Sequence, residues 1–161
     1  MSESLDALIE RIKDRANDDD SIALKEALQL AEQHPGEMKV WFALAYVHGR
    51  NGNFDDAVAS MTRALEIGPR QPALYFHRGD FELERGNLQA ALADFTEGIA
   101  SSNDLQRSHY LKTLYFFRAD VLLRLGRKAE ARADLAHLPD NFSTWTTTLR
   151  TKQELLAQCD H

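Results

Sequence analysis

Hydrophobic residues recur along this chain at the three- and four-residue spacing of amphipathic helices, and polar stretches containing Gly or Pro interrupt the pattern at intervals. The period-two alternation typical of strands is absent from the sequence. The pattern predicts helices near 3–16, 20–33, 37–50, 54–67, 72–85, 88–100, 104–125, 128–137 and 143–158. We therefore expect an all-α fold.

An internal repeat organises these helices. The stretch FHRGDFELERG at 76–86 returns as FFRADVLLRLG at 116–126, in register at an offset of 40. One copy earlier the offset is 34, because Trp41 aligns with Tyr75 and Gly52 aligns with Gly86. A single copy is too small to bury its own apolar face, so neighbouring copies are expected to stack.

Large and small residues stand at fixed places in each copy. The first good copy has Trp41, Leu44, Ala45, Gly52, Phe54, Ala57, Met61, Ala64 and Pro69. The second has Tyr75, Gly79, Gly86, Leu88, Ala91, Phe95 and Gly98, and the third has Tyr115, Ala119, Leu122, Gly126, Ala131 and Leu135. Small residues would let the two helices of a copy approach, and Gly would end the first helix in the left-handed conformation. The pattern resembles the tetratricopeptide repeat, a 34-residue helix–turn–helix unit.

The resemblance implies a right-handed α-α superhelical solenoid in a single domain, 1–161. We expect good repeats at 38–71, 72–105 and 112–138, a degenerate repeat at 3–36 and a capping helix at 143–158. In that capping helix Ser143 or Thr144 would be the N-cap, and Trp145, Leu149 and Leu156 would share one face.

The offset of 40 places six extra residues between the second and third copies. Leu105, Tyr110, Leu111 and Leu114 continue a helical spacing into Tyr115. We therefore expect Asn103 or Asp104 to cap a helix lengthened at its N-terminal end, with the extension over 104–111. A longer loop is the alternative.

Two arginines in the repeated stretch each have an acid sixteen residues further on. Arg78 is followed by Asp94, and Arg118 is followed by Asp134; the equivalent residues of the first good copy are Leu44 and Ser60. Both charges are thus absent together in that copy. This joint change predicts an ion pair between the two helices of each later repeat, because a partly buried charge is costly without a partner.

The resemblance also implies a concave groove lined by the first helix of each repeat. The predicted groove residues are Phe42, Tyr46, Arg50, Phe76, Asp80, Leu83, Glu84, Phe116, Asp120 and Arg124. Partial burial in the core is the alternative for the three phenylalanines. Repeats that clamp a C-terminal carboxylate have Lys and Asn where this chain has Phe and Tyr or Asp, so that ligand is not expected. Aromatic rings beside carboxylates suit an apolar segment carrying a basic or amide group.

Charge and composition narrow the partner. The net charge is −6, which disfavours nucleic acid or an anionic membrane as the main partner. Cys159 is the only cysteine, so no disulfide can form within the chain and a reducing compartment is expected. No signal-peptide core or apolar run of membrane-spanning length is present in the sequence, and we expect a soluble, cytoplasmic protein.

Catalytic signatures are missing from the sequence. Its histidines, at 34, 48, 77, 109, 137 and 161, have no metal-ligand spacing, and there is neither a nucleophile elbow nor a phosphate-binding Gly-rich loop. We expect no enzyme activity, no metal and no cofactor.

The sequence thus predicts a non-catalytic scaffold that binds another protein or an extended peptide in its groove. One alternative is a bacterial secretion chaperone of the translocator type, since such proteins are similarly small, acidic and built of about three repeats. They often pair through their N-terminal helices, so this alternative includes a homodimer. Another is an immunity or inhibitor protein that neutralises a toxin enzyme.

Overall fold

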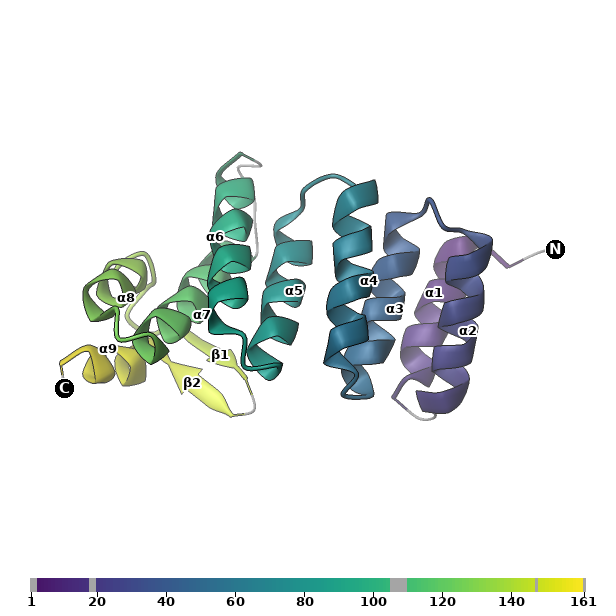
Figure 1. Ribbon diagram of the computed structural model, residues 1–161. Coiled ribbons are helices and arrows are strands. Elements are labelled where there is room, and N and C mark those ends of the chain that lie inside the picture. Colours follow the sequence, from purple (N-terminus) through teal and green to yellow (C-terminus); the bar gives the residue numbers. More distant parts are fainter. Residues whose placement is uncertain (1–2, 18–19, 105–109, 147, 161) are drawn as a thin grey trace. The chain divides into compact units, whose positions relative to one another are not determined.

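The computed structural model describes residues 3–17, 20–104, 110–146 and 148–160 (Figure 1). In chain order its elements are α1 (Leu5–Arg15), α2 (Asp20–Gln33), α3 (Met38–Arg50), α4 (Phe54–Ile67), α5 (Pro72–Glu84), α6 (Leu88–Asp104), α7 (Tyr110–Arg124), α8 (Lys128–Leu135), β1 (Ser143–Trp145), β2 (Leu149–Thr151) and α9 (Lys152–Asp160). The expected all-α repeat fold is confirmed, with one short antiparallel hairpin added near its end.

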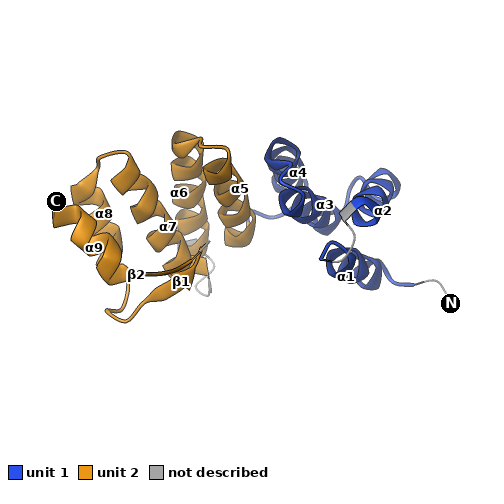
Figure 2. Ribbon diagram, turned by 90° about the horizontal axis from the view of Figure 1, so that it is seen from below, with its two compact units in different colours: residues 1–70 blue, residues 71–161 orange. Residues whose placement is uncertain are grey.

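The chain divides into two compact units, 1–70 and 71–161 (Figure 2). The first holds α1 to α4, and the second holds α5 to α9 with the hairpin. Each unit buries its own hydrophobic cluster, one running from Ile9 to Val47 and the other from Ala91 to Cys159. The sequence predicts one domain, whereas the structure groups the chain around two cores.

The helices that open the three good copies end alike, at a glycine with positive φ. Gly52, Gly86 and Gly126 have φ of 72°, 76° and 75°. At the end of α5 the Asn87 N–H donates to the Glu82 carbonyl at 2.8 Å, and the Gly86 N–H donates to the Leu83 carbonyl at 2.9 Å. This Schellman pattern satisfies carbonyls that a helix end leaves open, and only Gly adopts its left-handed residue without strain.

Small residues in the first helix of a repeat allow close packing on the second. A Cβ added to Gly79 would lie 2.6 Å from the Phe95 ring, which is itself fully buried. A larger residue at position 79 would therefore push α5 away from α6, as the spacing of the repeat predicts.

Both predicted ion pairs are present. Arg78 Nη2 donates to Asp94 Oδ1 at 2.6 Å, and Arg118 Nη2 donates to Asp134 Oδ1 at 2.6 Å; the Nε of each arginine donates to the same carboxylate. Both aspartates are buried. Fork-to-carboxylate bonds of this kind fix geometry as well as charge.

The start expected for the seventh helix, at 104 with a cap at Asn103 or Asp104, is wrong. Residues up to Asp104 belong to α6, and α7 begins at Tyr110. Relative to the preceding copy, α6 gains three residues at its C-terminal end and α7 gains two at its start. Residues 105–109, where the rest of the insertion falls, lie outside the described residues.

The expected capping helix over 143–158 is too long. Residues 143–145 and 149–151 pair as β1 and β2, and the helix begins only at Lys152. Its start is a capping box, because the Glu154 N–H donates to Thr151 Oγ1 at 3.2 Å and the Thr151 N–H donates to Glu154 Oε2 at 2.7 Å. Trp145 and Leu149 consequently lie on the hairpin, where both are exposed.

Candidate partner-binding site

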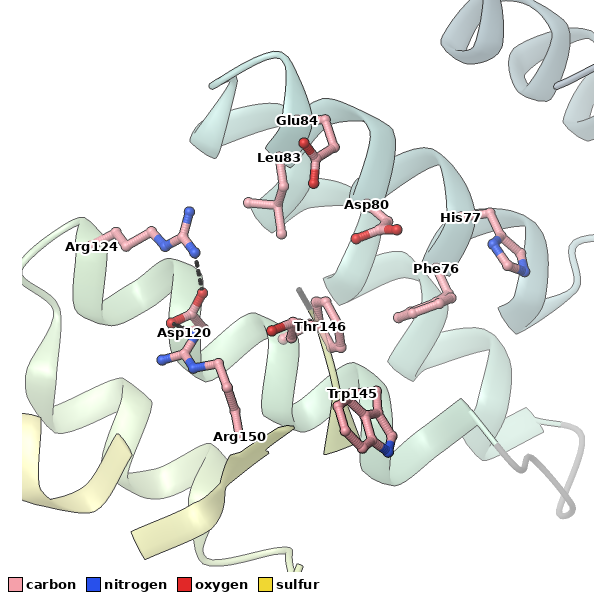
Figure 3. A pocket seen from close by; sticks show the side chains of 11 residues that line it. Phe76, His77, Asp80, Leu83, Glu84, Asp120, Arg124, Trp145, Thr146 and Arg150 are labelled. Atoms are coloured by element: carbon pink, nitrogen blue, oxygen red, sulfur yellow. Dashed lines mark hydrogen bonds and ion pairs between the residues drawn. The ribbon is translucent and has the colours of Figure 1, made fainter. Parts of the chain in front are cut away.

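The second unit contains a cavity of about 570 Å³ between α5, α7 and the hairpin (Figure 3). It is lined by Phe76, His77, Asp80, Leu83, Glu84, Phe117, Asp120, Arg124, Trp145, Thr146 and Arg150. Helix α5 forms one wall, α7 forms the second, and the hairpin faces both.

The α5 wall is one face of a helix. Phe76, Asp80, Leu83 and Glu84 are spaced by four, three and one residues, which brings them to the same side. The Phe76 ring is half-buried and meets the Phe117 ring edge-on, with 5.2 Å between ring centroids. This contact between the Phe76 and Phe117 rings holds the α5 wall of the cavity against α7.

Asp120 on the α7 wall is already neutralised within the chain. Arg150 Nη1 from β2 donates to its Oδ1 at 2.8 Å, and Arg124 Nη2, one turn further along α7, lies 2.8 Å from its Oδ2. The Asp120 side chain is only 9% exposed. The hairpin is thus tied to α7 by an ion pair that water screens poorly.

Asp80 on the α5 wall is the opposite case. Among the described residues, no hydrogen bond or ion pair reaches its carboxylate. Burial, and then the neighbouring charge of Glu84, raise the pKa of Asp80 to about 6. The site therefore holds a half-buried carboxylate to which the described part of the chain gives no counterion.

Aromatic groups border this carboxylate on the hairpin side and along α5. Trp145 is 74% exposed at the rim, while Thr146 completes the hairpin wall. The His77 ring contacts the Phe76 ring edge-on at 5.2 Å, and its Nε2 is 3.5 Å from the Tyr110 hydroxyl. An unpaired carboxylate beside exposed aromatic surface is the arrangement that attracts an organic cation.

Six of the ten residues predicted for the groove line this cavity together: Phe76, Asp80, Leu83, Glu84, Asp120 and Arg124. For Phe116 the structure shows the alternative, burial in the core. Its side chain is 1% exposed and packs against Phe117 and Phe142, so it belongs to the core. Phe142, from the segment that leads into the hairpin, covers it, and Phe117 lines the cavity instead.

Phe42, Tyr46 and Arg50 lie in the first unit and remain a separate prediction. Phe42 is half-buried, with the Lys13 ammonium 5.7 Å from its ring centroid. Tyr46 packs partly against the core of that unit, and Arg50 is exposed at the end of α3.

Sequence reasoning missed the hairpin residues of the site. Trp145 was assigned to the capping helix, and Thr146 and Arg150 were not assigned to the groove at all. The run STWTTTLRT contained a signal, because β-branched Thr residues dominate it and favour extended backbone.

Within the described ranges, no group of three or more His, Cys, Asp or Glu residues is placed to hold a metal ion. Of the described helices, none combines the length and apolarity needed to cross a membrane.

Comparison with known proteins supplies the family and the fold. The sequence profile of the tetratricopeptide repeat family matches residues 15–72 and 42–105. Protein SGT1 homolog of Bos taurus is 37% identical over 93 residues, which is 58% of this chain and 25% of that protein. The chain thus spans about a quarter of the length of this relative.

Two solved structures share the fold. YrrB, described as a TPR protein with an unusual peptide-binding site, has a TM-score of 0.63 and 15% identity over 78% of this chain and 64% of its own. The type III secretion translocator chaperone SycD of Yersinia enterocolitica has a TM-score of 0.65 and 17% identity over 78% of this chain and 90% of its own. At these identities the likeness shows the fold alone.

Proposed function

This chain belongs to the tetratricopeptide repeat family, and from that premise we propose that it is a non-catalytic adaptor whose cavity between α5, α7 and the hairpin binds a segment of a partner protein. The fold itself is a protein–protein interaction scaffold. The proposal adds where the partner binds.

Asp80 is the observation that carries this proposal. A carboxylate with a structural role is paired when it is buried, as Asp94, Asp120 and Asp134 are. Asp80 is half-buried, has no such pair among the described residues and opens into a cavity. A partner group that compensates its charge would offset the cost of this partial burial.

A capture experiment tests the site. The protein, immobilised through a terminal tag, is incubated with lysate of its native cell, and bound proteins are identified by mass spectrometry. We expect Asp80→Lys to lose the partner, because the new ammonium reverses the charge of the cavity. Asp14→Lys is the matched control, since Asp14 is an exposed residue of α1 and the charge change is the same.

Circular dichroism of both variants verifies the fold before capture is compared. Undiminished capture by a folded Asp80→Lys variant would contradict the proposal. Turnover of a substrate by the purified protein would contradict its non-catalytic part.

A secretion chaperone is the second candidate. The small, acidic, three-repeat chain suggests it, and the likeness in fold to SycD is compatible with it. A chaperone should keep a client soluble in a complex of the two, whereas an adaptor should bind two partners at once. Native mass spectrometry of complexes recovered by the capture experiment separates these outcomes and reports whether the protein is a homodimer.

A further inference from the structure

We propose that the cavity selects a lysine or arginine side chain, presented by an extended segment of the partner, and that Asp80 is the acceptor of its cationic group. This inference rests on the proposed function, because it names the chemistry of the ligand at the same site. Three features of the cavity support it.

The chain itself contains an aspartate at the equivalent repeat position that already binds a basic side chain. Asp80 and Asp120 stand at the same place in successive copies, 40 residues apart. Asp120 binds Arg150, which belongs to an extended strand, with 2.8 Å between Nη1 and Oδ1. The hairpin thus presents Arg150 to the third repeat, whereas the described chain presents no such side chain to Asp80 in the preceding repeat.

Charge in the cavity is divided between its two walls. On the α7 wall, Asp120 binds Arg124 of the same helix and Arg150 of β2, so both cations already have a partner. On α5, Asp80 and Glu84 are both acidic. A cationic group would meet two carboxylates there, whereas an anionic group would be repelled.

The apolar lining suits the stem of a long basic side chain. Phe76 and Leu83 flank Asp80 on the α5 face, and Trp145 borders the cavity from the hairpin (Figure 3). Lys and Arg pack their methylene stems on such surfaces, and a ring face attracts their charged ends. A hydrated metal ion would leave this lining unused, so an organic cation is the better match.

Selection from a random heptapeptide library tests the inference on the full chain. We expect Lys or Arg to be enriched among peptides bound by the wild-type protein and not among those bound by Asp80→Asn. Peptides selected without Lys or Arg would overturn the inference and leave the proposed function standing. A library that yields no binder would also overturn the inference, whereas the proposed function is overturned by undiminished capture of the partner by a folded Asp80→Lys variant.

Chemical variants of a selected peptide then isolate the charge. Replacing its lysine by norleucine keeps the four-carbon stem, replacing its arginine by citrulline keeps the length of the side chain, and both changes remove the cation. We expect about 10- to 100-fold weaker binding by titration calorimetry, since hydrogen bonds between ionised groups are the strong class. The same replacements should change little when the protein is Asp80→Asn. Equal affinity of the charged and uncharged peptides for the wild type would refute the role of Asp80.

The pH dependence gives an independent readout. Because the cation binds the ionised carboxylate, affinity should fall about tenfold between pH 7.5 and pH 5, as protonation proceeds through the raised pKa of Asp80. The other charged or titratable groups facing the cavity are His77 and Glu84 from α5, Asp120 and Arg124 from α7, and Arg150 from β2.

His77 is the group that could mimic this effect, since protonated imidazole would also repel a cation. We therefore expect the fall in affinity to persist in His77→Gln and to vanish in Asp80→Asn. Persistence in Asp80→Asn would assign the pH effect elsewhere and overturn Asp80 as the acceptor.

Discussion

Asp80 and Asp120 show how one position in a repeat can meet two different electrostatic environments. Asp120 receives Arg124 from its own helix and Arg150 from the hairpin, so its charge is compensated. Asp80 lies one copy earlier, where the described chain supplies no such strand, and its pKa rises to about 6. The difference arises outside the repeat motif, in the segment that follows it.

Removing the charge of Asp80 should stabilise the protein at neutral pH. The pKa of Asp80 in the folded state lies above its ordinary value of 3.8, so the stability contribution of Asp80 is complete below 3.8 and is lost as pH rises through about 6. We expect Asp80→Asn to raise the free energy of unfolding by about 1–2 kcal/mol at pH 7.5, allowing for partial solvation. Urea unfolding at pH 7.5 and pH 5 measures it. The gain should shrink at the lower pH, and a gain that grew there would contradict the assignment.

The Arg78–Asp94 pair offers a second test at this scale. Arg78→Leu alone should cost about 3–5 kcal/mol, because it leaves the buried Asp94 carboxylate without its main partner. The double variant Arg78→Leu/Asp94→Ser reproduces Leu44 and Ser60, the buried pair of the preceding copy, and should be much less destabilised. Chemical denaturation of wild type, both single variants and the double variant gives the coupling energy. Strictly additive effects would mean that the pair is not coupled.

Contacts of single residues could be predicted where two positions change together between repeats. They could not be predicted where two adjacent residues are of the same type. Arg78 and Asp94 could be paired because both charges are missing from the first good copy. Phe116 and Phe117 are adjacent aromatics, and which one faces the cavity depends on Phe142, a residue outside the repeat. Helical spacing alone does not contain that information.

At the scale of elements, the hairpin is the feature that the repeat pattern hides. Its strands are three residues each, too short for a period-two signal, and they lie among residues whose spacing also fits a helix. The decisive local signal was the capping box from Thr151 to Glu154, which places the start of α9 eight residues after Thr144. Of the extra residues, 102–104 belong to the end of α6 and 110–111 to the start of α7, a division that apolar spacing does not predict.

The capping box should stabilise α9. Thr151→Val keeps a β-branched residue at the end of β2 but removes the oxygen that accepts the Glu154 N–H. We expect a loss of about 0.5–2 kcal/mol and faster hydrogen exchange of the first amides of α9. Thr148→Val is the control, because its side chain is exposed outside the cap. Equal effects of the two variants would show that the cap contributes nothing.

For the whole molecule, the two cores set the expected pattern of stability. Leu44 is buried in the cluster of the first unit and Leu135 in that of the second. Repeat proteins couple mainly through neighbouring elements, so damage to one core should act first on its own unit.

Matched truncations test this pattern. Leu135→Ala should cost about 2–5 kcal/mol and reduce hydrogen-exchange protection most strongly in α7, α8 and α9. Leu44→Ala should have its main effect in α1 to α4. Uniform loss of protection along the whole chain in either variant would indicate a single cooperative unit.

The repeat fold was predictable because glycine and small residues mark each of the three good copies, whereas the division at residue 70 was not. The boundary follows Gly68 and Pro69, and Pro69 is the residue that ends an ordinary copy. The junction at 68–71 has the same length as the one at 34–37, which also contains Pro and Gly. The division depends on which residues contact each other in the folded chain, and the repeat pattern of the sequence does not contain that information.

The hairpin also provides a spectroscopic handle on the site. The chain has two tryptophans, of which Trp41 lies on α3 in the first unit and Trp145 borders the cavity in the second. Trp41 donates its indole N–H to the Pro35 carbonyl, and replacing it by Phe leaves Trp145 as the only indole. Because Trp145 is 74% exposed, covering it with a bound segment would shift its emission to shorter wavelength. Occupancy of the cavity could then be followed in solution without any attached dye.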